Sequence, residues 1–197
     1  MDNYEFDIFE PKIGKIVPED LAFEVFHEGK VVPASFGNLR GSWTVLLFYP
    51  ADFTFVCPTE LEDMQSLYAD FKKEGAEVIS MSTDTVFSHK VWKEVSPAIK
   101  TLEYPMGADP SHEISEAFEV LMPEKGLANR GTFIIDPEGV IKAIEITHDA
   151  IGRSAKDTLR KLKAAKFAMS HPGNVCPANF DDGNASLTPS IDMAGTL

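Results

Sequence analysis

The sequence has 197 residues, 44% of them hydrophobic, so it can bury one substantial core and we expect a single folded domain. Its 31 acidic and 18 basic residues give a formal net charge of −13 at pH 7. Because such a surface repels phosphate backbones, the composition argues against a nucleic-acid partner.

The beginning of the chain predicts a hairpin and no targeting segment. Residues 1–7 contain neither the basic stretch nor the apolar stretch of a secretory signal. The longest apolar run, residues 45–49, is far too short to span a bilayer, so we expect no membrane association and a cytoplasmic location. Two short runs, residues 22–26 and 31–36, flank a turn that contains Gly29, a pattern that predicts paired antiparallel strands.

A strand, a helix and a second strand follow. Residues 44–49 are continuously apolar, which is typical of a strand buried on both faces. From Pro58 onward, apolar residues recur at helical spacing until Gly75, and residues 76–83 predict the next strand. This order predicts a right-handed βαβ unit with parallel strands, followed by a helix near residues 87–95.

The second half predicts another hairpin and a closing helix. Residues 131–135 and 140–146 surround an Asp-Pro-Glu-Gly turn, which is typical of paired antiparallel strands. Ser154, with Asp157 three residues later, predicts a variant capping box at the start of a helix that ends near residue 169. On that helix, the side chains expected to face the core are Leu159, Leu162 and Ala165.

The order of these elements predicts an α/β protein with a thioredoxin-like fold. We expect a central mixed β-sheet flanked by helices on both faces, with an N-terminal hairpin and a C-terminal arm. Residues 1–170 should form the domain. Residues 171–197 are turn-rich, carry Cys176 and should form the mobile arm.

The two cysteines, Cys57 and Cys176, leave three interpretations open. A reducing cytosol disfavours structural disulfides, so such a pair is catalytic, redox-sensing or buried and inert. Two thiols so far apart in the chain cannot by themselves form a zinc site of the Cys₄ or Cys₂His₂ type. The sequence also lacks a G-x-G-x-x-G motif and a P-loop, so we expect no metal, flavin or nicotinamide cofactor.

Cys57 lies between a predicted buried strand and the helix that follows it. Pro58 suits the first helical position, which would place Cys57 at the N-cap, where free N–H groups and the helix dipole favour a thiolate. Thr54 stands where a Cys-x-x-Cys motif would have its first cysteine. Its hydroxyl is able to hydrogen-bond a thiolate and a bound oxygen.

The helix start also carries Glu60 and two further acidic residues, which oppose a thiolate. A cation must therefore compensate. Arg130, just before a predicted strand, and Arg153, just before the last helix, are the candidates. A lone arginine in a loop is usually a solvated surface residue, so the predicted fold is what makes these two plausible.

The segment around Cys57 resembles the active site of the peroxiredoxins. Pro50-x-x-x-Thr54-x-x-Cys57 matches their signature, and residues 48–60 are similar to the two-cysteine group that contains the alkyl hydroperoxide reductase C subunits. The likeness extends from about residue 40 to the C-terminus. Its further matching strings are Ser82-Thr83-Asp84-Thr85, His89-Lys90-x-Trp92, Arg130-Gly131-Thr132-Phe133, Gly152-Arg153 and His171-Pro172-Gly173-x-Val175-Cys176-Pro177-Ala178.

The resemblance implies a role for each matching residue. Cys57 would be the peroxidatic thiolate, and Cys176 the resolving cysteine, which in this family attacks from the partner subunit. Thr54 and Arg130 would hold the peroxide and stabilise the developing charge, and Pro50 would shield the site from water. The residues expected behind them are Glu60 and Arg153, which would orient Arg130, and Trp92, which would pack near the active-site loop.

The resemblance also implies partners. The substrate would be a hydroperoxide, and the oxidised enzyme would be regenerated by a disulfide reductase, either a flavoprotein or a thioredoxin-like donor. The chain would form a homodimer and a ring of five dimers. Two other functions remain as alternatives: a redox-regulated holdase chaperone or peroxide-signalling scaffold, and a plain disulfide reductase, against which the missing Cys-x-x-Cys counts.

Some positions depart from the family pattern. Phe180 stands where relatives commonly have Trp, and Ser88 where they often have Thr at the surface between dimers. These changes bear on the arm and on the ring rather than on the chemistry. The chain also lacks the Gly-Gly-Leu-Gly insert and the Tyr-Phe pair of peroxide-sensitive relatives, which implies resistance to excess peroxide.

Overall fold

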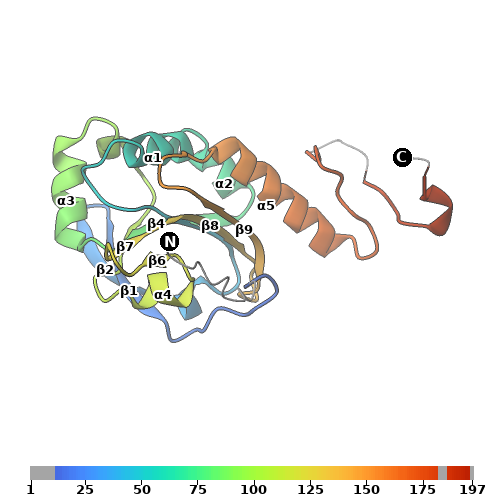
Figure 1. Ribbon diagram of the computed structural model, residues 1–197, viewed down its shortest axis with the longest axis horizontal. Helices are drawn as coiled ribbons and strands as arrows, with labels where there is room; N and C mark the ends of the chain where they lie inside the picture. The colour runs from blue at the N-terminus through green and yellow to red at the C-terminus, as the bar shows by residue number, and fades with distance from the viewer. Residues whose placement is uncertain (1–11, 182–185, 196–197) are drawn as a thin grey trace, which may run out of the picture.

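A seven-stranded mixed sheet forms the centre of the computed structural model, which describes residues 12–181 and 186–195 (Figure 1). The strand order is β2-β1-β5-β4-β3-β8-β9. The strands are β1 (Ala22–His27), β2 (Lys30–Ser35), β3 (Trp43–Phe48), β4 (Ala76–Ser82), β5 (Met106–Ala108), β8 (Arg130–Ile135) and β9 (Ile141–Thr147), and a separate small pair consists of β6 (Leu121–Met122) and β7 (Leu127–Ala128).

Helices cover both faces of the sheet, as the sequence predicted (Figure 1). The α-helices are α1 (Cys57–Ser66), α2 (Tyr68–Lys73), α3 (Val86–Val95), α4 (Glu113–Ala117) and α5 (Ala155–Ser170). The short 3₁₀ helices are η1 (Phe36–Leu39), η2 (Ile99–Thr101) and η3 (Ile191–Met193). Within the described ranges, no helix is long and apolar enough to cross a membrane.

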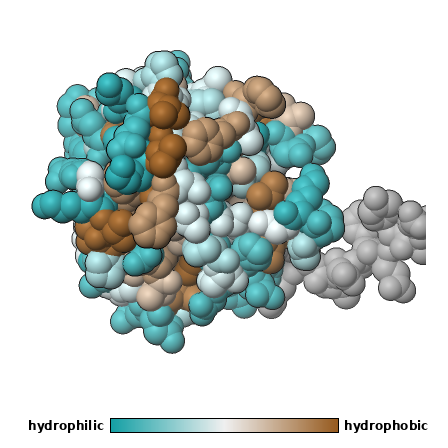
Figure 2. Space-filling model, turned by 90° about the vertical axis from the view of Figure 1, so that its left-hand side faces the viewer, coloured by the Kyte–Doolittle hydropathy of each residue, from teal (hydrophilic) through white to brown (hydrophobic). Residues whose placement is uncertain are grey.

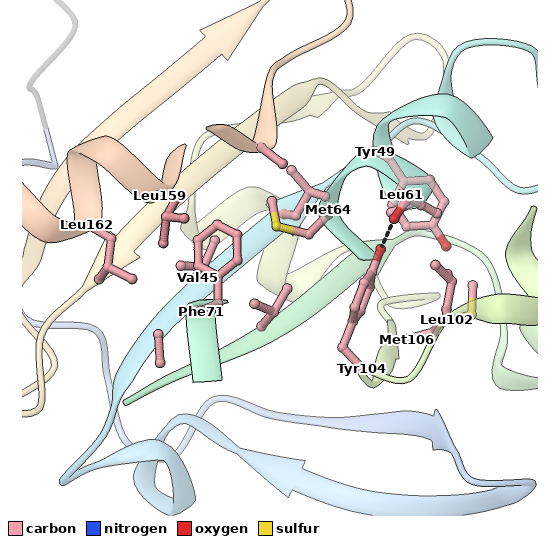
Figure 3. Packing of buried hydrophobic residues seen from close by; sticks show 14 of the residues in the cluster. Val45, Tyr49, Leu61, Met64, Phe71, Leu102, Tyr104, Met106, Leu159 and Leu162 are labelled. Carbon is pink, nitrogen blue, oxygen red and sulfur yellow. Dashed lines mark hydrogen bonds between the residues drawn. The ribbon is translucent and has the colours of Figure 1, made fainter. Parts of the chain in front are cut away.

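The predicted strand pairings are confirmed. β1 and β2 form the N-terminal antiparallel hairpin, β8 and β9 form the second one, and β3 runs parallel to β4 with Val45 opposite Val78. The central strand β3 is buried along its whole length. Because successive side chains of a strand point to opposite faces, β3 contributes to two cores. Val45 and Leu47 pack with α1, α2 and α5 (Figure 3), whereas Leu46 and Phe48 pack with α4 on the other side.

The single helix predicted from Pro58 to Gly75 is wrong in one respect, because it is broken at Leu67. Leu67 has φ −110° and ψ 6°, outside α-helical geometry, and it separates α1 from α2. After this break Tyr68 packs edge-on against Tyr104, with ring centroids 5.6 Å apart, and Phe71 is fully buried. Apolar periodicity alone does not reveal a break in a helix that is stabilised by tertiary packing.

The capping box predicted at Ser154 is also wrong. The Ser154 side chain makes no capping hydrogen bond. Instead, the Ala155 N–H donates to Asp63 Oδ2 of α1 at 2.8 Å. The first N–H groups of a helix have no partner within the helix, and here a distant carboxylate satisfies one of them and complements the helix dipole.

This contact predicts which side chain stabilises the start of α5. We expect Asp63→Ala to lower the free energy of unfolding by about 1 kcal/mol, because one hydrogen bond to a helix N-terminus is lost. Ser154→Ala is the matched control and should change stability by less than about 0.5 kcal/mol. Urea unfolding of the two variants measures both values, and equal losses would restore the role of Ser154.

The chain after α5 folds back onto this helix. Phe180 is only 3% exposed, and its ring centroid lies 4.9 Å from that of Phe167. Arg160 of α5 donates to the carbonyl of Ala178 at 3.1 Å. Residues 176–181 thus pack on α5 in this state. The division of the chain at residue 170 and the mobility of the arm stay predictions.

Candidate active site

Cys57 is fully buried, at 0% exposure, in the first turn of α1. The predicted position at the N-cap is off by one residue. Val56 already has helical dihedral angles and is the N-cap, so Cys57 is the first helical residue and Pro58 the second. The Val56 carbonyl accepts the N–H groups of Thr59 and Glu60 at 3.0 and 3.3 Å, which starts the helix earlier than the proline alone indicated.

Arg130 brings a positive charge into direct contact with the sulfur. It is the first residue of β8, and its Nη1 donates to Cys57 Sγ at 3.3 Å and to Glu60 Oε2 at 2.6 Å. Its Nε donates to the Asp149 carbonyl at 2.7 Å, so the guanidinium is held from two sides. Burial alone would lower the pKa of Arg130, but the hydrogen bond and charge of Cys57, together with Glu60, raise it. Arg130 therefore remains a cation beside the thiol.

Glu60 connects Arg130 to a second buried arginine. Its Oε1 accepts both the backbone N–H and the Nε–H of Arg153 at 2.8 Å, and its Oε2 accepts from Arg153 Nη2 at 3.2 Å. Burial would raise the pKa of Glu60, but the hydrogen bonds and charge of Arg153, with the charge of Arg130, lower it. One carboxylate thus faces two guanidinium groups, so the buried charges beside Cys57 have a net positive sign.

Two more hydrogen bonds hold Arg153. Its Nη2 donates to the carbonyl of Phe48 at the end of β3, at 2.8 Å, and its Nη1 donates to Thr132 Oγ1 on β8, at 3.1 Å. The arginine thereby links the start of α5 to two strands of the sheet. The structure brings together four of the predicted site residues, namely Cys57, Glu60, Arg130 and Arg153.

Thr54 does not donate to the sulfur. Its Oγ1–H donates to the carbonyl of Ala51 at 2.8 Å, so the hydroxyl proton is already used within the loop. The hydroxyl oxygen keeps its lone pairs, which leaves Thr54 as an acceptor for an O–H group entering the site. Pro50, two residues after the end of β3, is buried, and Phe53, between Pro50 and Thr54, adopts the left-handed region with φ +58°.

Trp92 of α3 packs beneath this loop. It is buried, and its ring centroid lies 6.0 Å from that of Tyr49 and 6.0 Å from that of Phe53. Trp92 contacts the loop from the side of α3 and so supports the segment that carries Pro50 and Thr54.

A buried polar network in the same loop was not predicted. Asp52 Oδ1 accepts from the Tyr49 hydroxyl at 2.8 Å, and Asp52 Oδ2 lies 2.8 Å from His89 Nδ1. His89 Nε2 lies 3.0 Å from the Gly107 carbonyl, which can only accept, so Nε2 carries a hydrogen. Burial raises the pKa of Asp52, although His89 opposes the shift. The string His89-Lys90-x-Trp92 was among those that match the family, but nothing local linked His89 to Asp52.

Cys176 lies away from Cys57 in this arrangement. Both cysteines are free thiols, and Cys176 Sγ lies 3.5 Å from the carbonyl of Ala164 on α5. Ala164 is nine residues beyond Ala155, which contacts α1, so it lies roughly 14 Å further along the helix axis. Burial raises the pKa of the Cys176 thiol, so in this position the neutral thiol is favoured. Among the residues that the structure describes, no group of three or more His, Cys, Asp or Glu side chains is arranged to hold a metal ion.

Comparison with known proteins decides what this site belongs to. Residues 13–144 match the AhpC/TSA family. The chain belongs to this family. It is 51% identical over 172 residues to alkyl hydroperoxide reductase C of Pseudomonas aeruginosa, covering 87% of this chain and 92% of that protein. It is 50% identical over 187 residues to alkyl hydroperoxide reductase C of Bacillus subtilis, and the match covers 94% of this chain and 98% of that protein.

Solved structures of the family agree with the fold. The Enterococcus faecalis AhpC crystal structure superposes with a TM-score of 0.83 at 40% identity and covers 85% of this chain and all of that one. The reduced Plasmodium vivax 2-Cys peroxiredoxin superposes with a TM-score of 0.87 at 28% identity, and the match covers 93% of this chain and 96% of that one. The thioredoxin-like fold is confirmed, and this member of the AhpC/TSA family is a peroxiredoxin, a thiol-dependent peroxidase.

Proposed function

We propose that this peroxiredoxin reduces hydrogen peroxide and alkyl hydroperoxides with Cys57 as the peroxidatic residue. The observation that carries the proposal is the 3.3 Å hydrogen bond from Arg130 Nη1 to Cys57 Sγ, both of which are buried. The alkyl substrates are inferred from relatives that are named alkyl hydroperoxide reductase C. No resident cofactor is needed, because sulfur carries out the redox step.

The first step breaks the O–O bond. The Cys57 thiolate attacks one peroxide oxygen, that oxygen becomes part of a sulfenic acid, and the other oxygen leaves as hydroxide or alkoxide and takes up a proton. Charge develops on the two oxygens during the transfer. The Arg130 guanidinium stabilises that charge, and the Thr54 oxygen accepts the O–H of the bound peroxide.

Three further residues keep these groups in place. Glu60 and Arg153 orient Arg130 through their shared hydrogen bonds. Pro50 shields the sulfur from water, in keeping with its burial beside the active-site loop. Trp92 supports this loop through its contacts with Tyr49 and Phe53. We assign the catalytic roles to Cys57, Thr54 and Arg130.

The second step forms a disulfide. The Cys176 thiol of a partner subunit attacks the sulfenic sulfur of Cys57, and water leaves. An intersubunit bond is favoured because Cys176 of the same chain contacts Ala164, far along α5 from the start of α1. A disulfide reductase then returns both sulfurs to thiols. That reductase is either a flavoprotein or a thioredoxin-like protein, and a reducing cytoplasm is the compartment suited to this cycle.

The association of subunits uses two surfaces. The first lies on α3, where Phe87, Val91 and Val95 recur at a four-residue spacing and are exposed (Figure 2). Phe53 and Phe55 of the active-site loop, 54% and 92% exposed, add to the exposed apolar surface. Apolar surface of this kind is typical of an interface between proteins.

The second surface is the edge of β9, the last strand of the sheet, beyond Ile141, whose N–H and carbonyl pair with Lys15 and Gly14. The opposite edge strand, β2, contains Pro33, which discourages strand pairing, whereas β9 has no proline and can pair with another copy. Two different surfaces per chain allow dimers to join into a closed ring. We infer a homodimer that assembles into a ring of five dimers.

The role of Arg130 can be tested directly. We expect Arg130→Ala to slow the reaction with hydrogen peroxide at least about ten-fold, because a lost charge-assisted hydrogen bond costs about 1.5–3 kcal/mol. The second-order rate constant of thiol oxidation, measured by stopped flow, gives this value. Arg130→Lys is the matched control, since it keeps the charge and loses the paired geometry. An unchanged rate constant in Arg130→Ala would remove Arg130 from the site.

A further inference from the structure

The second turn of α1 carries a hydrogen bond that the helix itself does not require. The hydroxyl of Tyr104 donates to the carbonyl of Leu61 at 2.8 Å (Figure 3). A carbonyl inside an α-helix already accepts the N–H four residues later, so Tyr104 adds a second bond from outside. Tyr104 lies just before β5 and is only 1% exposed. Its burial raises its pKa well above the usual value, so the phenol stays protonated and remains a donor.

The contact lies one turn beyond Cys57, in the part of the helix that must move when Cys57 forms a disulfide. Cys57 is fully buried against Arg130, and its sulfur must come within about 2.05 Å of another sulfur to form a disulfide. The start of α1 must therefore unwind for Cys57 to leave its pocket. Leu61 follows Cys57 by four residues, so unwinding by one full turn reaches the carbonyl that Tyr104 holds.

Two other hydrogen bonds to this part of α1 come from the residue before Tyr104 and from the start of α5. The Glu103 N–H, next to Tyr104, donates to Gln65 Oε1 at 2.8 Å, and the Ala155 N–H donates to Asp63 Oδ2. These bonds are made by surface carboxylate and amide groups. Nearer to Cys57, buried Glu60 is held by Arg130 and Arg153, which belong to the site already described. Beyond Glu60, the Tyr104 hydroxyl makes a buried hydrogen bond to the backbone of α1.

We propose that Tyr104 is a positioning residue that opposes the unwinding of α1 and so limits how fast oxidised Cys57 meets Cys176. The inference rests on the proposed disulfide mechanism. The sulfenic acid on Cys57 either condenses with the Cys176 thiol and releases water, or reacts with a second peroxide to give sulfinic acid and water or alcohol. A firmer helix gives the second reaction more time. Tyr104 thus influences how much enzyme is lost at high peroxide.

Tyr68 supplies a matched control. It packs edge-on against Tyr104, with ring centroids 5.6 Å apart. Among the residues that the structure describes, its hydroxyl has no hydrogen-bond partner, so Tyr68 makes no polar side-chain contact with α1. Tyr68→Phe and Tyr104→Phe therefore remove the same atom from neighbouring rings, and only the second removes a bond to α1.

The experiment compares the two steps in wild type, Tyr104→Phe and Tyr68→Phe. Stopped flow measures the reaction with peroxide, quenched intact-mass analysis measures disulfide formation and sulfinic acid, and hydrogen exchange follows the amides of α1. In Tyr104→Phe we expect disulfide formation to accelerate about three- to ten-fold, the factor that corresponds to about one hydrogen bond. The sulfinic fraction should fall, α1 amides should exchange faster, and the peroxide step should stay unchanged.

The outcomes separate this inference from the proposed function. Equal rates of disulfide formation in Tyr104→Phe and Tyr68→Phe would overturn the role of Tyr104. A Tyr104→Phe variant in which both steps slow together would also overturn it, because that pattern indicates general loosening of the site. Wild-type enzyme that forms no disulfide at all would contradict the proposed mechanism itself, whatever Tyr104 does.

Discussion

Cys57→Ser should abolish peroxide reduction while leaving the fold intact. Serine differs from cysteine only by an oxygen in place of the sulfur. It is slightly smaller and fits the same buried position, so the packing of α1 is kept. Its hydroxyl does not ionise in the physiological range and does not transfer electrons to peroxide as a thiolate does. Arg130 and Glu60 remain in place but have no nucleophile to activate.

The measurement is peroxide consumption with excess reductant, run beside thermal unfolding of the same sample. Cys57→Ser should give the rate of the reaction without enzyme and an unfolding midpoint close to that of wild type. Cys176→Ser is the matched control, because it makes the same substitution at the other cysteine but should still consume about one equivalent of peroxide per subunit, which Cys57→Ser should not. Enzyme-dependent consumption in Cys57→Ser would contradict the assignment of Cys57.

Cys176→Ser should stop sustained turnover but not the first reaction with peroxide. Its Cys57 pocket is unchanged, so about one equivalent of peroxide per subunit should be consumed rapidly as the sulfenic acid forms. Without a resolving thiol no disulfide follows, and further peroxide converts Cys57 to sulfinic acid. Wild type has the faster alternative and should stay resistant.

A non-reducing gel and intact-mass analysis distinguish the outcomes. Peroxide-treated wild type should run as a disulfide-linked dimer, and Cys176→Ser as a monomer. A monomeric oxidised wild type would instead indicate a bond within one chain, which requires Cys176 to leave Ala164 and reach its own α1. Equal sulfinic acid in wild type and variant would show that resolution does not protect Cys57.

The sequence was sufficient for the elements whose residues are near neighbours in the chain. Alternation and apolar runs predicted the two hairpins and the parallel β3–β4 unit, because side-chain periodicity reports directly which faces are buried. Periodicity was not sufficient at Leu67, where α1 gives way to α2, nor for the short elements between residues 97 and 130. Such short elements contain too few residues to show a period.

The sequence by itself also named the candidate nucleophile and its candidate cations. A thiol at a strand-to-helix junction, Thr54 three residues before it, and two arginines were sufficient to name the candidate groups. Only the tertiary structure decided which atoms meet. Glu60 reaches Arg130 and Arg153 across 70 and 93 residues of chain, and Asp63 rather than Ser154 caps α5. Partners so far apart depend on how whole elements pack, and a local pattern carries no information about that packing.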